Sequence, residues 1–140
     1  MSTNFEYSKK IDILYIPMKY IKLFAQYVPR FAIGIIMIYM AIVTVSGNPD
    51  ALQSFEHFGL PLWVMGLSGA MLFAGGILLM QWQNKKLQEY AHVGFLIYFL
   101  GAFMAHIGIG DPVEAGIPAL AFLALTLASL GQNHLSEGKK

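Results

Sequence analysis

The sequence YAHVGFLIYFLGAFMAHIGIGDP, from Tyr90 to Pro112, decides the fold that the rest of the chain must fit. Before the Gly-Asp-Pro sequence at its end, it contains no Asp, Glu, Lys or Arg. About 20 mostly apolar residues are enough for a helix to cross a bilayer. Two histidines, His92 and His106, interrupt the apolar run. We therefore predict a transmembrane helix over about residues 90–109 that carries two polar side chains.

Three further runs of the same kind complete the pattern, over about residues 30–46, 62–82 and 117–131. The chain of 140 residues is 56% apolar and only 12% charged, whereas an ordinary soluble domain has about 25% charged residues. We therefore predict an all-α protein, a four-transmembrane-helix bundle that forms one membrane domain over residues 29–131. A soluble all-helical core is the alternative, and four uncharged runs of this length argue against it.

The first 28 residues differ from the rest because lysines alternate there with aromatic and aliphatic residues. Apolar residues recur at helical spacing from Ile21 to Val28, and Lys19 and Lys22 lie away from them. This pattern predicts a short amphipathic segment over residues 1–28 that lies in the headgroup region. A loosely ordered tail is the alternative.

The membrane domain is expected to begin at Pro29, because proline suits the first position of a helix. Arg30 follows it and is expected to be an interfacial anchor, with its charge at the membrane surface and a lipid phosphate or Glu89 as partner. At the other end of the chain, residues 132–140 are expected to form a cytoplasmic tail.

Charges are divided between the two ends of the predicted helices. The basic residues lie at the amino-terminal end, in the second connection or in the tail: Lys9, Lys10, Lys19, Lys22, Arg30, Lys85, Lys86, Lys139 and Lys140. The first and third connections hold Asp50, Glu56, Asp111 and Glu114 and no Lys or Arg. Because basic residues concentrate on the cytoplasmic side of membrane proteins, we predict that both termini are cytoplasmic.

Glycines give the spanning runs faces that other helices can approach closely. Gly94, Gly101 and Gly108 recur every seven residues and predict a close-contact seam within the bundle. Replacement of Gly101 by Leu is therefore expected to destabilise the protein. Gly34 and Ala41 share a face in the same way, and the second run is also rich in small residues. These faces are expected to bind other membrane proteins or a second copy of the chain.

A polar cluster is predicted at the outer end of the bundle. An ionisable group such as His106 is costly inside a membrane and usually faces a bundle interior or a wet cavity. The two acidic connections flank it, so the expected members are Glu56, His57, His106, Asp111 and Glu114. Carboxylates near a histidine favour its charged form. The cluster suits proton transfer, a quinone headgroup or a divalent metal, although we assign no metal site. A hydrogen-bonded group that only ties the connections together is the alternative.

The histidine spacing raises a second hypothesis. His92 and His106 lie about four helical turns apart on one face, near opposite membrane surfaces, as in b-type cytochromes. His57 and His134 are their candidate partners in haem ligation. However, His57 lies in a connection and His134 lies past the predicted end of the last helix. An interfacial histidine at a helix start is the simpler interpretation of His92.

Some classes of chemistry are excluded by what the sequence lacks. The chain has no cysteine, which excludes disulfides and thiolate-held iron–sulfur clusters. It contains no phosphate-cradling loop, no nucleophile motif and no nucleic-acid signature, so we expect no nucleic-acid partner.

Three stretches in this order resemble the DoxX-like family of small four-helix membrane proteins. They are PRFAIGIIMIYM (29–40), EHFGLPLWVMGLSGAMLFAGGILL (56–79) and EYAHVGFLIYFLGAFMAHIGIGDP (89–112). The resemblance covers about residues 27–131. It implies a four-helix bundle in the bacterial cytoplasmic (inner) membrane. Some members of the family are associated with quinone-linked oxidation of sulfur compounds or with oxidative-stress complexes, and animal relatives act as membrane chaperones.

From these observations we predict a non-catalytic or quinone-interacting membrane subunit of a redox complex, with a quinone headgroup near His106. A membrane-protein chaperone or assembly factor without enzymatic activity is the first alternative. A b-type haem electron carrier is the second. Family members that use cysteine chemistry do not serve as a model, because this chain has no cysteine.

The orientation is testable because any introduced cysteine is the only one in the chain. Cysteines in place of Asn48 or Gly110 are expected to react with a membrane-impermeant thiol reagent in intact cells. Cysteines in place of Asn84 or Ser136 are expected to react only after the cells are opened. Labelling at Asn84 in intact cells would contradict the predicted orientation.

Overall fold

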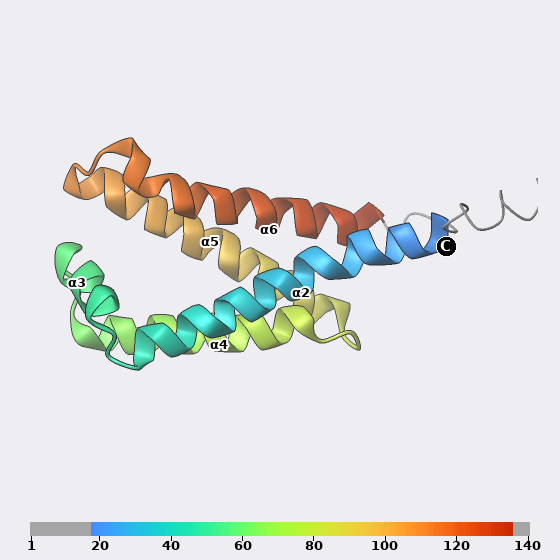
Figure 1. Ribbon diagram of the computed structural model, residues 1–140, viewed down its shortest axis with the longest axis horizontal. Helices are drawn as coiled ribbons and strands as arrows, with labels where there is room; N and C mark the ends of the chain where they lie inside the picture. Colours follow the sequence, from blue (N-terminus) through green and yellow to red (C-terminus); the bar gives the residue numbers. More distant parts are fainter. Residues whose placement is uncertain (1–17, 136–140) are drawn as a thin grey trace, which may run out of the picture.

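The computed structural model describes residues 18–135, which form four long helices, one short helix and one turn of 3₁₀ helix (Figure 1). In chain order these are α2 (Met18–Val45), α3 (Pro49–His57), α4 (Leu62–Met80), α5 (Lys85–Ile109), η1 (Val113–Gly116) and α6 (Ile117–Leu135). No strand occurs within this range. The first 17 residues of the expected interfacial segment and residues 136–140 of the expected tail lie outside the described part.

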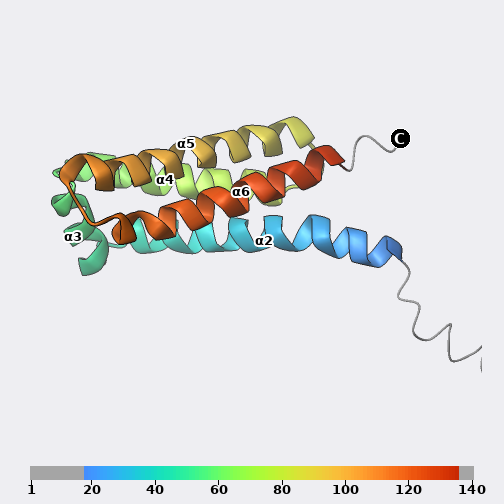
Figure 2. The same cartoon turned by 90° about the horizontal axis from the view of Figure 1, so that it is seen from above.

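The long helices run alternately in opposite directions, so that each packs antiparallel to the next one along the chain (Figures 1 and 2). α2 packs most extensively against α4, α5 packs against both α4 and α6, and α6 also touches α2, which closes the bundle. One end of the bundle holds the start of α2 and the end of α6, and we call it the termini end. The opposite end holds α3 and η1, and we call it the α3 end.

The predicted transmembrane bundle is confirmed. Four helices are long and apolar enough to cross a membrane, over 27–45, 62–80, 85–109 and 113–132. Large apolar side chains point outward along them, among them Ile35, Tyr39, Ile97 and Leu127. Such a surface suits contact with lipid chains, because polar groups are costly there.

The first helix differs from the expectation in where it begins. Pro29 does not open it, because α2 runs unbroken from Met18 to Val45 with Pro29 inside. Proline lacks one backbone N–H and therefore removes a single hydrogen bond from the helix, to the carbonyl four residues earlier. The last third of the expected interfacial segment is thus continuous with the first spanning helix.

Side-chain caps set the starts of two helices. Asn48 caps α3 by accepting the N–H of Asp50 at 2.9 Å, and Asn84 caps α5 by accepting the N–H of Leu87 at 3.3 Å. Asparagine is among the preferred residues at this position because its side-chain oxygen satisfies an unpaired backbone donor. The cap at Asn84 places the start of α5 at Lys85, one and a half turns before the expected start.

The closest helix contact lies between α2 and α4. A Cβ atom added to Gly76 would lie 2.8 Å from the carbonyl oxygen of Gly34, and one added to Gly34 would lie 3.0 Å from that of Gly76. Two turns away, Gly69 meets Ala41 and Val45. Small residues let helix backbones approach closely inside a membrane, where apolar burial from water does not drive association. The predicted small-residue face of the first helix is therefore confirmed.

Aromatic residues fill the space between α4, α5 and α6. Phe95 of α5 packs where Gly75 of α4 leaves room, because a Cβ atom there would lie 2.7 Å from the Phe95 ring. Phe99 stacks on Phe122 of α6, with ring centroids 5.3 Å apart. A hydrogen bond of 2.8 Å between the hydroxyls of Ser68 and Tyr98 also joins α4 to α5.

The predicted seam along the third spanning helix is wrong as a contact within the bundle. Added Cβ atoms at Gly94, Gly101 and Gly108 meet nothing within 4 Å, and Gly101 and Gly108 are exposed. α5 instead turns its phenylalanine face toward the core. The seven-residue period does place the three glycines on one face of α5, but that face lies on the outside of the bundle.

This packing predicts that glycines of the same chain differ in their tolerance of one methyl group. Gly76→Ala should force α2 and α4 apart and cost about 1–3 kcal/mol, as at other overpacked sites. Gly101→Ala is the matched control on an open face. Its thermal midpoint, measured in the same detergent, should be unchanged or slightly raised, because alanine favours the helix. Equal losses in both variants would contradict this account.

Candidate functional site

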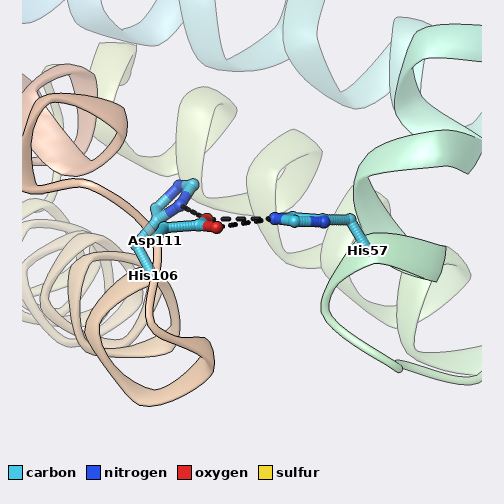
Figure 3. A network of polar contacts seen from close by, with 3 residues as sticks. All are labelled: His57, His106 and Asp111. Atoms are coloured by element: carbon cyan, nitrogen blue, oxygen red, sulfur yellow. Dashed lines mark hydrogen bonds and ion pairs between the residues drawn. The ribbon is translucent and has the colours of Figure 1, made fainter.

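The α3 end brings together three of the five polar residues expected there. His57 lies at the last position of α3, His106 lies in the last turn of α5, and Asp111 lies two residues after the end of α5. Figure 3 shows the Asp111 carboxylate between the two imidazole rings. We call His57, His106 and Asp111 the outer triad.

Gly110 positions the carboxylate. This residue adopts a left-handed conformation with φ of 83°, which glycine reaches without strain. The N–H of Gly110 donates to the carbonyl of Ile107 at 3.1 Å, and the N–H of Asp111 donates to that of His106 at 3.0 Å. These two bonds form the Schellman motif that often ends helices. The motif turns the chain back so that Asp111 lies beside His106, one turn earlier in the sequence.

Both histidines bond to the same carboxylate. The Nδ1 atom of His106 lies 2.7 Å from Oδ2 of Asp111, and the Nε2 atom of His57 lies 2.9 Å from Oδ1 and 3.1 Å from Oδ2. An ionised carboxylate only accepts hydrogen bonds, so each imidazole donates through the nitrogen that faces it. Phe58 packs its ring against the edge of His106, with centroids 4.8 Å apart.

The triad holds the carboxylate in its charged form. The hydrogen bond from His106 has the largest effect and lowers the pKa of Asp111 below its ordinary value of 3.8. Desolvation has the next largest effect and opposes it, and the hydrogen bond and charge of His57 lower the pKa further. The second nitrogens of both rings, Nδ1 of His57 and Nε2 of His106, form no hydrogen bond with any residue in 18–135. The triad can therefore offer two imidazole nitrogens to a ligand while its carboxylate stays ionised.

Glu56 and Glu114 are not joined to the triad. Both side chains are exposed, and within the described residues no hydrogen bond or ion pair links them to the two histidines or to Asp111. No three side chains of His, Cys, Asp or Glu in 18–135 are placed to hold a metal ion.

The termini end holds a second polar group, which the sequence did not predict as a unit. Arg30 of α2 donates from Nη1 to Oε1 of Gln88 on α5 at 2.9 Å. His92, one turn further along α5, meets Ser129 of α6 at 3.0 Å through Nε2. All four side chains are buried. We call these four residues the inner polar layer.

Arg30 is enclosed in the bundle, whereas its charge was expected from the sequence to lie at the membrane surface. Only 3% of its surface is exposed, and its guanidinium lies 4.8 Å from the ring centroid of Tyr27 and 5.7 Å from that of Phe31. Helix periodicity indicates that Arg30 faces the bundle interior, because Arg30 lies one turn from Ile33 and Gly34, which face the other helices. Its partner is Gln88, which lies next to the expected Glu89 but on the buried side of the helix.

His92 also has a tertiary role in place of the expected interfacial one. It is fully buried, its Nδ1 atom donates to the carbonyl of Gln88 at 2.7 Å, and its Nε2 atom meets Ser129. Haem ligation requires an imidazole nitrogen that faces the iron, so this geometry favours a structural role for His92. The side chain of His134, its expected partner, lies outside the described part.

The architecture defines an integral membrane protein built as a four-helix bundle with polar groups at both ends. A comparison with family models matches residues 30–129 to the DoxX-like family. The chain belongs to this family, as the resemblance in its sequence indicated. No curated protein and no solved structure matches the chain.

The pKa of Asp111 predicts a pH dependence. Because its pKa is lower in the folded state, its bonds stabilise the fold above the unfolded value near 3.8, and this stabilisation is lost as the pH falls through the folded value. Asp111→Asn should lower the thermal midpoint at pH 7, and its difference from the parent should shrink below about pH 4.

Glu114→Gln is the control, because it removes an exposed carboxylate at the same end and should match the parent at both pH values. A deficit of Asp111→Asn that is the same at pH 7 and pH 3 would show that the ionised carboxylate does not contribute.

Proposed function

We propose that the protein lies in the bacterial cytoplasmic membrane with both termini in the cytoplasm. Membership of the DoxX-like family and the four spans support a multi-pass membrane protein. The orientation is supported by the charges at the ends of the bundle. Lys85 and Lys86 begin α5 at the termini end, and Asp50, Asp111 and Glu114 lie at the α3 end. The positive-inside rule places the lysines in the cytoplasm.

We further propose that the chain is the quinone-interacting membrane subunit of a redox complex. The observation that carries this proposal is the outer triad, in which one carboxylate holds two histidines at the end of a spanning helix. A quinone headgroup resides near the membrane surface and exchanges protons when it is oxidised or reduced. A site for it needs a group that titrates near neutral pH, and histidine is that group.

The triad can supply a proton to the headgroup and then replace that proton. A protonated His106 can donate from Nε2 to a quinone carbonyl while its Nδ1 atom donates to the carboxylate of Asp111. His57 is more exposed and shares the same carboxylate, so it can pass a replacement proton from solution. Imidazole and carboxylate groups can transfer protons but do not supply electrons. The electrons would therefore come from a partner redox subunit.

The second candidate function is that of an assembly factor or chaperone for other membrane proteins. The observation that favours it is the open face of α5, where Gly94, Gly101 and Gly108 meet no other part of the chain. Such a face can receive a helix of a partner or of a second copy. Under this function the triad only ties α3 to the end of α5.

A tryptophan at the same end of the bundle as the triad provides a test of quinone binding. Trp63 lies in the first turn of α4, at the α3 end, and Trp82 lies at the opposite end. In a Trp82→Phe background, a short-chain benzoquinone should quench Trp63 fluorescence saturably. His106→Leu removes the hydrogen bonds to headgroup and carboxylate and should weaken the apparent affinity by about tenfold or more.

Glu56→Gln is the matched control, because this exposed carboxylate is not bonded to the triad. His106→Gln keeps a donor and an acceptor and should fold if His106→Leu does not. Quenching that rises without saturation, or is the same in both His106 variants and the parent, would contradict the quinone site. Copurification of partner proteins with such variants would then favour the assembly function.

A further inference from the structure

A positive charge lies buried in the inner polar layer without a carboxylate partner. Arg30 is almost fully enclosed, and its only hydrogen bond within the described residues goes to the neutral amide of Gln88. No ion pair joins Arg30 to another described residue, and the ion pairs of Asp111 lie at the far end of the bundle. An enclosed cation without a counter-charge is strongly unfavourable, so the site calls for an anion.

The donors that Arg30 leaves unused have the geometry that binds an oxyanion. Nη1 bonds to Gln88, whereas Nε and Nη2 are buried and have no partner. These two N–H groups lie along one edge of the guanidinium and match two oxygens of a carboxylate or phosphate in parallel hydrogen bonds. The rings of Tyr27 and Phe31 flank the guanidinium and help to fix its orientation.

A second buried polar atom at the termini end also has no hydrogen-bond partner. Gln132 lies one turn beyond Ser129 on α6, toward the termini end, and its Oε1 atom is buried without a hydrogen bond. Rotation of the amide about its last bond would turn the NH₂ donor to the place of Oε1. Gln132 can thus contribute a donor to an anion between α2, α5 and α6.

We propose that Arg30, with Gln88 and Gln132, forms a binding site for a phosphate group, supplied by the headgroup of an anionic phospholipid. Arg30 lies three residues inside the span that begins at Tyr27, about 4.5 Å from its end, so that it is close to the headgroup region. A groove of about 440 Å³ opens between α2 and α4 at the same end of the bundle, and it is lined by Phe31, the neighbour of Arg30 in the sequence, and by Ile38, Ile77, Met80, Gln81, Trp82 and Gln83. Its mostly apolar lining suits an acyl chain and favours a lipid over free phosphate. This proposal does not depend on the outer triad.

Gln88→Glu provides a test that keeps the shape of the site. The new carboxylate would lie where Oε1 of Gln88 now accepts from Arg30, so the chain would supply its own counter-charge. The variant also loses the hydrogen bond that Nε2 of Gln88 donates to the carbonyl of Gln81, so its thermal midpoint in lipid-free neutral detergent serves only as the starting value for its own titration. The variant should lose the response to added anions, because the charge that attracts them is neutralised.

The thermal midpoint of the purified full chain is then titrated with dioleoylphosphatidylglycerol, dioleoylphosphatidylcholine and inorganic phosphate. We expect a saturable rise with phosphatidylglycerol and little with phosphatidylcholine, whose headgroup has no net charge. Arg30→Lys keeps the charge but not the two-donor edge, and should weaken the apparent affinity by about tenfold or more. Lys86→Gln removes an exposed charge at the same end and should respond like the parent.

Each outcome bears on the site. A saturable rise with inorganic phosphate that equals the rise with phosphatidylglycerol also supports the phosphate site and assigns free phosphate as its source. The absence of a saturable rise with either anion in the parent overturns the proposal. An equal response to both lipids, or a Gln88→Glu variant that still responds to phosphatidylglycerol like the parent, overturns it as well.

Discussion

The rest of the structure depends on the contact between the backbones of α2 and α4 at Gly34 and Gly76. Lipid chains are as apolar as the side chains of the helices, so burial from water does not hold spanning helices together. Close backbone approach and the packing it permits must do so instead. The contact fixes α2 against α4, and the phenylalanines of α5 and α6 then close the bundle over Gly75. The contact between Gly34 and Gly76 also fixes the orientation of α2 about its own axis, so that Arg30 faces the interior of the bundle.

The two ends of the bundle use polar residues in opposite ways. At the α3 end, short elements carry His57 and Asp111 to the surface, where the carboxylate has two hydrogen-bond donors and the rings remain accessible. At the termini end, long helices enclose Arg30 and Gln88, and the Nε and Nη2 donors of the Arg30 guanidinium have no hydrogen-bond partner. The first end therefore leaves two imidazole nitrogens open to its surroundings, whereas the second leaves two guanidinium donors enclosed without a partner.

Three of the five residues that the sequence placed in one cluster are bonded to one another, and particular residues show why the other two are not. His57, His106 and Asp111 meet because two connections end at the same membrane surface, which charge and hydropathy indicate. Glu56 does not join them because it is next to His57 in one helix, and neighbouring residues point about 100° apart. Glu114 does not join because Pro112 starts a new turn that carries it away. Proximity in sequence therefore predicted the region but not which side chains face each other.

The sequence by itself determined that this chain spans a membrane four times and that its polar connections lie at opposite ends. Hydropathy and charge are properties of local segments, and the bilayer acts on each segment directly. Only the tertiary structure decided that the glycines of α2 and α4 meet while Gly101 faces outward, and that Arg30 is buried beside Gln88. A helical period specifies which residues share a face, but the identity of the partner face is set by how all four helices pack together.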